Sequence, residues 1–547
     1  MLLPKKKSYP AYKKYVEQMF KSDDLEVVEA AFLIVGAVTE GCAEYVKRDL
    51  KFYIEQYIDN GLTHNSLEIR RATCYAINQF AQYLQPDILI WHSKIIPGLI
   101  KILEDKDPDG LTSAVITVEI FCLEMNESIV KYLEELLPKL IQIVDQDSTP
   151  LAAKRHAILS ISSCAEAAEG KFVPYAKELI PLLGQLLNIT DVQHLEIRAV
   201  ATSCLASIVG HCIDDAPEVF NDLIAQYVPE ILKGLKEIDH PILREFSFTF
   251  FFSMASFMGE NFKDYMEELL RLANKAIDTI RAAALDKNEN DDLEADSDEE
   301  GLENVMVNEN LIEEMAAAIK CLGEIAKACP KQFAPYYKGA VEQLLKSTEH
   351  YHAQVRMQAM IGLQNIAIAL AKAEGDGKVI PFKRGLPLQR KYNEDIEEFI
   401  FIIFYEKVLF LIEDDPNIDM VRGAVECIGE LLIELGPGAV YQKLERIVEA
   451  LELIFNNETT AQQKLYGEDD EEINGEILTS ATELAEQIAK YCGDEFLPLF
   501  EKLMPLIVSF IGPDYPEDDV AQIVGVLGQC CKHMPTLAKK KGYEILQ

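Results

Sequence analysis

Apolar residues recur along this chain at helical spacing, and one apolar phrase containing proline returns about every forty residues. The phrase reads IIPGLIKIL around Pro97, and it recurs around Pro138, Pro181, Pro229 and Pro505. The first three prolines are 41 and 43 residues apart, and the fourth follows after 48. A fixed period of this length predicts a repeated unit of secondary structure rather than a set of unrelated elements.

A second phrase runs in register with the first and supplies the other half of the unit. Leu-Glu-Ile-Arg occurs at 67–70 and again at 195–198, 128 residues later. Equivalent segments begin at Leu25, Ala152, His240, Ala353 and Asp419, and they place apolar residues at i, i+3, i+4 and i+7. That spacing is typical of an amphipathic helix. The unit is therefore predicted to be a helix A that carries the proline, a short turn, and a helix B that opens near the arginine.

These patterns predict an all-α fold, an α-solenoid of HEAT repeats in which antiparallel helix pairs stack into a superhelical array. Periods of about 40 to 47 residues are typical of HEAT and armadillo repeats. No sustained strand-like alternation occurs among the 547 residues, and 49% of them are hydrophobic. One helix pair cannot bury its apolar faces alone, so stability is expected to come from interfaces between neighbouring repeats.

Two acidic tracts interrupt the predicted repeats and define the organisation of the chain. Residues 286–303 hold ten acids and one base, and residues 468–476 hold six acids and no base. Dense like charge with few apolar residues predicts disorder. We expect repeats at 1–285, an acidic disordered loop at 286–310, repeats at 311–465 with a long connection at 371–393, an acidic insertion at 466–476, and repeats again at 477–547.

The net charge is −39, and the acidity extends beyond the two tracts. An acidic surface repels nucleic-acid phosphates and speeds encounters with basic proteins, so we expect basic protein partners and no direct nucleic-acid binding. Alternatively, the charge only keeps a large protein soluble. The acidic loop has the same two interpretations, a mimic of nucleic acid that shields basic cargo or a solubilising insertion. Its acidic candidates are Asp291, Asp292, Glu294, Asp296, Asp298, Glu299 and Glu300.

Cysteines and apolar runs indicate the compartment. The twelve cysteines show no CxxC spacing, and Cys74, Cys164, Cys204 and Cys427 lie in apolar helix stretches, as expected for buried free thiols in a reducing compartment. No apolar run is long enough for a signal peptide or a membrane span. We therefore expect a cytosolic or nuclear protein with no membrane insertion. We also expect a monomer.

Catalytic signatures are absent, which predicts a protein that is not an enzyme and needs no cofactor or metal. The chain contains no HExxH, GxSxG, P-loop or GxGxxG motif. The pair His211–Cys212 resembles a nucleophile and base, but a helix end with a buried thiol is the better interpretation. The paired acids Asp414 and Asp415 fall in a turn, where caps or solvated positions are expected.

Polar residues on the B helices that do not fit the apolar stripe are the candidate binding residues. Acids and amides in rows can hold the ammonium groups and backbone of an extended basic peptide, and several weak sites add by multivalency. Alternatively, these are ordinary solvated helix positions. Aligning the B helices places Asn78, Glu119 and Ser162 in one row and Gln82 and Glu166 in the next, with Ser163 and Ser207 nearby and Asn365 and Glu430 further along.

Several longer phrases resemble the importin-beta, or karyopherin-beta, family, and most closely the branch of importin four and its yeast counterpart. They stand in the family's order along the whole chain, with the acidic insertions between them. The phrases are LEIRRATCYAINQFAQYLQPDI with IIPGLIKIL, ILREFSFTFFFSMASFMGENF, NENLIEEMAAAIKCLGEIAKACPKQFAPYYKGAVEQLL, MVRGAVECIGELL and GDEFLPLFEKLMPLI.

The resemblance implies a nuclear import receptor. Family members carry basic cargo such as ribosomal proteins and histones through nuclear pores, bind Phe-Gly nucleoporins between A helices, and release cargo to Ran-GTP. The family's amino-terminal repeats, which hold much of the Ran-GTP contact, have no counterpart here, and several carboxy-terminal repeats are also missing. We therefore expect a central fragment, with Ran-GTP binding in question. The alternative is a static HEAT scaffold of the phosphatase-subunit or chromosome-organising type.

Overall fold

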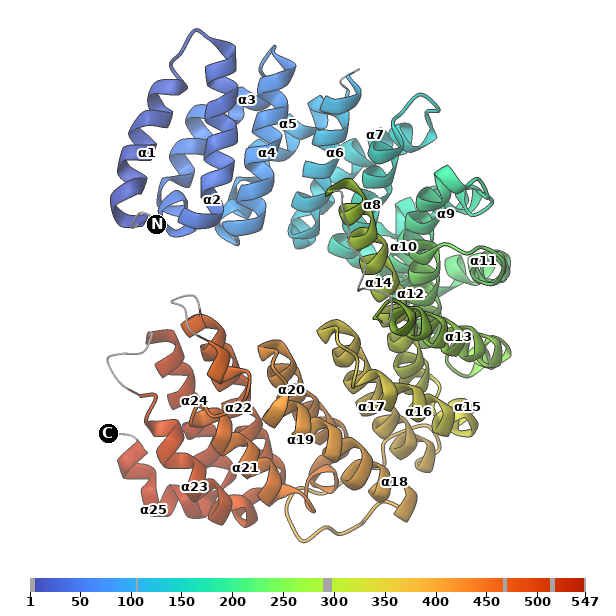
Figure 1. Cartoon of the computed structure of the whole chain (residues 1–547), viewed down its shortest axis with the longest axis vertical. Helices are drawn as coiled ribbons and strands as arrows, with labels where there is room; N and C mark the ends of the chain where they lie inside the picture. The colour runs from blue at the N-terminus through green and yellow to red at the C-terminus, as the bar shows by residue number, and fades with distance from the viewer. Residues whose placement is uncertain (1–4, 105–106, 289–297, 466–469, 512–516, 546–547) are drawn as a thin grey trace. The chain divides into compact units, whose positions relative to one another are not determined.

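A computed structural model describes residues 5–104, 107–288, 298–465, 470–511 and 517–545 (Figure 1). Within these ranges all regular structure is helical, and no strand occurs. The prediction of an all-α array of HEAT repeats is confirmed. The chain divides into two compact units, Met1–Ser253 and Met254–Gln547, and each is described by itself below.

The first unit is built from antiparallel helices. The longest, α2, consists of two helical segments that meet at a kink at Cys42, whose backbone is not helical. Its helices are α1 (Lys5–Met19), α2 (Leu25–Tyr53), α3 (Asp59–Leu62), α4 (Leu67–Tyr83), α5 (His92–Ile102), α6 (Pro108–Leu123), α7 (Leu133–Asp145), α8 (Leu151–Ala168), α9 (Val173–Leu186), α10 (Leu195–Cys212), α11 (Pro217–Glu237) and the first part of α12 (Pro241–Met258).

The second unit continues the same pattern with longer connections. Its helices are α13 (Lys263–Asn288), α14 (Asp298–Ala328), α15 (Pro330–Phe333), α16 (Tyr337–Ser347), α17 (Ala353–Glu374), α18 (Glu394–Glu398), α19 (Tyr405–Asp414), α20 (Ile418–Leu435), α21 (Leu444–Phe455), α22 (Asp470–Cys492), α23 (Leu497–Val508), α24 (Glu517–His533) and α25 (Pro535–Ile545).

The proline-bearing segments form the A helices, as predicted. Pro97, Pro138, Pro181, Pro229 and Pro505 lie inside α5, α7, α9, α11 and α23. The B helices begin at capping residues: Asp107 accepts a hydrogen bond from the backbone of Gly110 (2.6 Å), and Asn417 accepts one from Met420 (3.1 Å). A side chain that accepts from the first turn satisfies a donor that has no partner within the helix.

Within each unit the B helices form one closely packed layer and the A helices form the other. Helices α2, α4, α6, α8 and α10 pack successively in the first unit, and α14, α17, α20, α22 and α24 do so in the second, whereas successive A helices touch at few points. Small residues allow this approach. A Cβ atom added to Gly323 on α14 would lie 2.8 Å from the Cα of Gly362 on α17, closer than carbon atoms pack.

An arginine in the first turn of several B helices donates hydrogen bonds to the turn that precedes the helix. Arg70 donates to the carbonyl oxygens of His64 (2.7 Å) and Asn65 (3.1 Å), and Arg198 donates to that of Ile189 (3.0 Å). The predicted arginine slot is therefore structural, because it satisfies carbonyl groups that the turn leaves without helical partners.

The segments predicted to be irregular are partly helical. Residues 286–288 end α13 and residues 298–310 begin α14, so the predicted loop is corrected in these parts, and 289–297 lie outside the described residues. In the sequence, Leu302, Val305 and Met306 follow helical spacing. The second acidic insertion behaves similarly, since α22 begins at Asp470 while 466–469 are not described.

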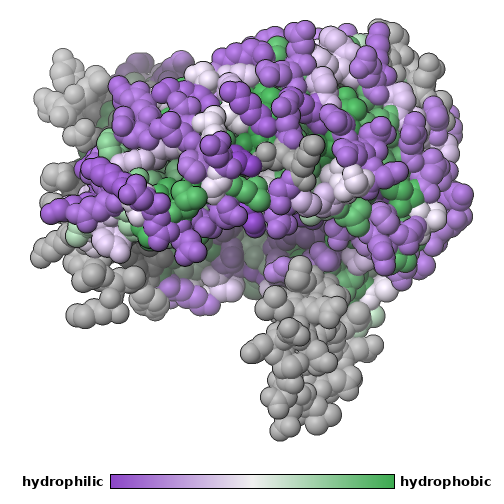
Figure 2. All heavy atoms as spheres, turned by 90° about the horizontal axis from the view of Figure 1, so that it is seen from above, coloured by the Kyte–Doolittle hydropathy of each residue, from purple (hydrophilic) through white to green (hydrophobic). Residues whose placement is uncertain are grey.

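Burial and surface composition fit the predicted solenoid. The twelve cysteines all lie in the described ranges and form no disulfide, and the predicted Cys74, Cys164, Cys204 and Cys427 are buried. On the face shown in Figure 2, hydrophilic side chains predominate and apolar ones form small patches between them. No helix in the described ranges has the length and apolar character needed to cross a membrane.

Candidate functional site

The B-helix layer of the first unit carries polar side chains that bridge neighbouring helices. Glu119 on α6 pairs with His156 on α8 (2.6 Å), and Ser207 on α10 donates to the backbone oxygen of Ser162 on α8 (3.4 Å). Ser207 therefore neighbours Ser162, whereas Glu119 is held by a histidine. The amide oxygen of Asn78 is buried without a hydrogen-bond partner among the described residues, and Gln82 and Glu166 are exposed.

Two of the predicted binding residues are not available to a partner, and their role is corrected. Ser163 is 7% exposed and donates to the backbone oxygen of Leu159 in its own helix (3.2 Å). Asn365 is 2% exposed and donates to Glu324 on the neighbouring α14 (3.1 Å). Helical periodicity places both near the B-helix stripe, but close packing between B helices covers them.

The B-helix layer of the second unit carries a group of charges that sequence reasoning missed. Arg422 on α20 pairs with Asp419 (3.1 Å), lies near Glu426 (3.9 Å) and contacts Glu476 on α22. Ser480 donates to Glu426 (3.3 Å). The available signal was the i, i+3, i+7 spacing of Asp419, Arg422 and Glu426 on one helix face.

Further carboxylates follow the same B-helix face of the second unit. Glu313 on α14 accepts from Gln354 on α17 (2.7 Å), and Glu483 on α22 accepts from Gln522 on α24 (3.2 Å). Glu430, a predicted candidate, is partly exposed and has no ion-pair or hydrogen-bond partner among the described residues. Each unit therefore presents acids and amides on successive B helices, an arrangement that suits cationic and amide groups of an extended ligand.

The candidates in the acidic loop are only partly described. Asp291, Asp292, Glu294 and Asp296 lie outside the described residues. Asp298, Glu299 and Glu300 occupy the first turn of α14. The proposal that these acids shield basic cargo therefore stays a prediction.

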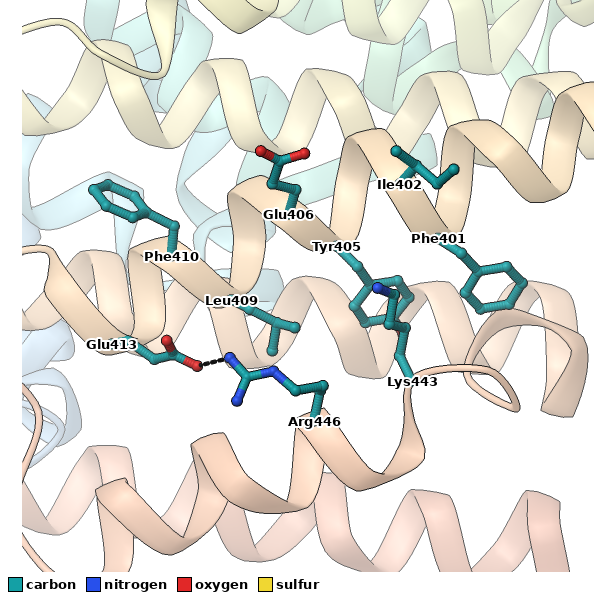
Figure 3. A pocket seen from close by; sticks show the side chains of 9 residues that line it. All are labelled: Phe401, Ile402, Tyr405, Glu406, Leu409, Phe410, Glu413, Lys443 and Arg446. Atoms are coloured by element: carbon teal, nitrogen blue, oxygen red, sulfur yellow. Dashed lines mark hydrogen bonds and ion pairs between the residues drawn. The ribbon is translucent and has the colours of Figure 1, made fainter.

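A groove on the A-helix side of the second unit was not predicted (Figure 3). It has a volume of about 320 Å³ and lies between α19, with the preceding π-helical turn Phe399–Phe404, and the start of α21. Ile402 and Phe410 on its rim are 58% and 55% exposed, although both are apolar. Arg446 donates to Glu413 at one end of the groove (2.7 Å), as the dashed line in Figure 3 shows.

A second groove of about 330 Å³ lies on the other side of α19 and shares Phe410. Its lining includes Thr348, at the end of α16, and Leu411. Helix α19 thus presents an exposed aromatic ring between two hollows. Such a surface suits an aromatic side chain flanked by flexible backbone.

The pair His211–Cys212 lies at the carboxyl end of α10. Burial, with Asp215 nearby, raises the pKa of Cys212 to about 12, and its thiol points at the backbone oxygen of Glu169 (3.5 Å). A protonated, buried thiol is a poor nucleophile, which suits the interpretation of Cys212 as a buried thiol at a helix end. Among the residues described, no three His, Cys, Asp or Glu side chains are grouped as metal ligands.

Family models and relatives match this architecture. The model of a HEAT-like repeat matches residues 316–366, and the model of importin repeat 6 matches 439–513. Importin-4 of Homo sapiens is 24% identical over 544 residues, 92% of this chain and 48% of the relative. Probable importin subunit beta-4 of Schizosaccharomyces pombe is 27% identical over 377 residues, 66% of this chain and 34% of the relative.

The chain is similar to proteins of the importin-beta family. Its resemblance to the importin-4 branch, inferred from the sequence, is confirmed by these relatives. Importin-beta solenoids of known structure share the fold. Karyopherin Kap121p bound to Pho4p aligns with a TM-score of 0.67 and 17% identity over 97% of this chain and 49% of that one, and Kap121p bound to Nup53p aligns at 0.66. The chain spans about half the length of the two mammalian importin-4 proteins and 34% of the length of the Schizosaccharomyces pombe relative.

Proposed function

We propose that this chain acts in a nuclear import receptor, shuttling between cytoplasm and nucleus, and that its B-helix layers hold basic cargo. The observation that carries the proposal is the series of acids and amides on successive B helices, including Glu119, Glu166, Glu426, Glu430 and Glu483. Basic proteins such as histones and ribosomal proteins are the cargo class that this chemistry favours.

Charge explains how such a surface works. Each carboxylate offers two acceptor oxygens to an ammonium or guanidinium group, and several sites engaged by one peptide add through effective concentration. Exposed ion pairs contribute only about 0.2–1 kcal/mol each, so affinity depends on many contacts and decreases with salt. The net charge of −39 speeds the encounter with basic cargo.

The grooves beside α19 are the proposed contact for Phe-Gly nucleoporins. A phenylalanine ring can enter a hollow of about 320 Å³ beside Ile402, Leu409 and Phe410. Short apolar contacts of this kind are individually weak, which suits rapid passage through a pore. Kap121p, with which the chain shares its fold, has a structure bound to Nup53p, which supports a nucleoporin as a partner.

The test is a pull-down of purified histone tails and ribosomal proteins by the chain, across a salt series and with or without Ran-GTP. We expect capture that weakens with salt. Reversal by Ran-GTP would extend the proposal to regulated release, whereas capture that Ran-GTP leaves unchanged would assign only cargo binding to this chain. No capture of basic proteins at low salt would overturn the proposal and favour a static scaffold.

A further inference from the structure

The long connection between α17 and α18 is held in place against the ends of two B helices. Residues 375–393 contain no helix and can be followed as the irregular ribbon at the lower edge of Figure 1. The backbone of Gly385 donates to the oxygen of Tyr491 at the end of α22 (2.7 Å), and Tyr392 donates to the oxygen of Leu435 at the end of α20 (3.2 Å). Phe382 packs on Tyr491, with ring centroids 5.8 Å apart.

This connection brings positive charge together in an acidic protein. The guanidinium of Arg384 and the ammonium of Lys490 lie 5.5 and 5.4 Å from the ring of Tyr491. Lys391 lies 5.3 Å from the ring of Tyr441. Burial lowers the pKa of His533, and the charges of Lys532, Arg384 and Lys490 lower it further, so these cations lie near the end of α24.

Most cations of this cluster form no ion pair within the described ranges, although Glu486 lies near Lys490 and Lys532. Arg390 pairs with Glu374 (3.4 Å), but the ion pairs of the described residues include none for Lys383, Arg384, Lys391, Lys490 or Lys532. Cations at helix carboxyl ends are favoured by the helix dipole, which accounts for Lys490 and Lys532. It does not account for Lys383, Arg384 and Lys391, which are exposed on the connection.

A cavity of about 490 Å³ opens beside these cations. Ile380, Phe382, Leu388, Tyr392 and Leu435 give it an apolar lining, and Lys383, Arg390 and Lys391 stand at the same cavity. A hollow with apolar walls and a cationic edge suits a ligand that combines a bulky apolar side chain with negative charge.

We propose that the connection 375–393 and the ends of α20, α22 and α24 form a docking site for a short acidic peptide that carries a bulky apolar residue. The apolar residue occupies the cavity lined by Phe382, Leu388 and Tyr392. Flanking carboxylates lie against Lys383, Arg384 and Lys391. This site is separate from the acidic B-helix face and selects partners of opposite charge.

Charge complementarity favours a short acidic peptide over a nucleic acid. The Debye length in physiological salt is about 8 Å, so a short peptide experiences the local cations more than the distant acids. A long polyanion would extend over acidic surface elsewhere on a chain with net charge −39. The cavity also provides an apolar enclosure, which suits an apolar peptide side chain.

The test is fluorescence anisotropy of the full chain with a labelled peptide of roughly ten residues, acidic throughout except for a central Phe-Leu pair. Two further probes separate the contributions: the same peptide with Ser-Ser at its centre, and an oligothymidylate of equal charge. The variants are Lys383→Glu with Arg384→Glu, and a matched control, Lys275→Glu with Lys338→Glu, which changes two exposed lysines elsewhere in the second unit.

We expect binding of the Phe-Leu peptide to weaken about ten-fold in the Lys383/Arg384 variant and to stay within about two-fold in the control. The Ser-Ser peptide and the oligothymidylate should bind more weakly than the Phe-Leu peptide. Equal losses in both variants, tighter binding of the oligothymidylate, or indifference to the Phe-Leu pair would each overturn the proposal. Circular dichroism of both variants verifies that folding is unchanged. The result is independent of whether the B-helix face binds basic cargo.

Discussion

Arg356 and Asp415 form a two-pronged ion pair between the start of α17 and the turn that follows α19. Nε and Nη2 of Arg356 donate to the two carboxylate oxygens of Asp415 at 2.8 and 2.9 Å. The side chains are 11% and 4% exposed. Nη1 also donates to the backbone oxygens of His350 (2.9 Å) and Tyr351 (2.8 Å), so one guanidinium ties two adjacent repeats together. The sequence predicted that Asp415 would be either a helix cap or a solvated residue. Because Asp415 is buried, the solvated alternative is wrong.

Replacing Arg356 with methionine should destabilise the second unit by about 3 kcal/mol, because it leaves the Asp415 carboxylate buried without its partner. Thermal unfolding followed by circular dichroism measures the change, and hydrogen exchange around residues 350–351 and 415–420 locates it. Arg422→Met is the matched control, since the ion pairs of Arg422 are exposed and should contribute little. Equal effects of the two substitutions would contradict a structural role for the buried pair.

Gly323→Ala should separate α14 from α17, because its Cβ would lie 2.8 Å from the Cα of Gly362. We expect a loss of about 1–3 kcal/mol, measured as a lower midpoint in thermal or urea unfolding. Gly525→Ala is the matched control within α24, where a Cβ meets nothing within 4 Å, and it should stabilise by about 0.5–1 kcal/mol. A neutral result for Gly323→Ala would mean that the helices can separate without cost.

His350 should make the second unit less stable in acid. Burial, with His352 and Arg281 adding to it, lowers the pKa of His350 to about 4, whereas an unfolded histidine titrates near about 6.5. Between these values the unfolded chain binds a proton that the folded chain does not, so the contribution of His350 is complete above about pH 6.5 and is lost as the pH falls towards 4. His350→Gln, which keeps an acceptor for the backbone of His352, should reduce the fall in melting temperature between pH 7 and 5. An equal fall in melting temperature in the unaltered protein and in His350→Gln would refute this prediction. His211→Gln, which replaces an exposed histidine, serves as the control.

Glu119→Gln combined with Glu166→Gln should weaken binding of a histone tail by about ten-fold and reduce its salt dependence, because two acceptors of positive charge become neutral. Anisotropy titrations with a labelled tail at several salt concentrations measure both effects. The control, Glu134→Gln with Glu135→Gln, changes the net charge equally on the exposed first turn of the A helix α7. If the control lost as much affinity, general charge rather than the B-helix face would be responsible.

Ile402→Asp combined with Phe410→Asp should reduce capture by immobilised Phe-Gly peptides at least several-fold, because charge would enter the apolar rim of both grooves beside α19. Column retardation measures the change. Ile90→Asp removes a similarly exposed apolar side chain in the first unit and should have no effect. Undiminished capture would place the Phe-Gly contact elsewhere.

The sequence by itself determined the repeat, the helix pair and the position of the arginine residues. These features can be read from the sequence, since helical spacing and the proline period are patterns along the chain itself. The resemblance to the importin-beta family also depended only on ordered phrases. The acidic segment at 298–310 was misread because charge density outweighed the helical spacing of Leu302, Val305 and Met306.

Only the tertiary structure decided which polar residues face solvent and which lie between helices. Asn365 and Glu430 occupy similar stripes, but the close contact of α14 with α17 at Gly323 and Gly362 buries Asn365, while Glu430 stays partly exposed. The grooves beside α19 and the basic cluster at Tyr491 join segments tens of residues apart. Their positions depend on side-chain packing between repeats, which periodicity along one helix does not specify.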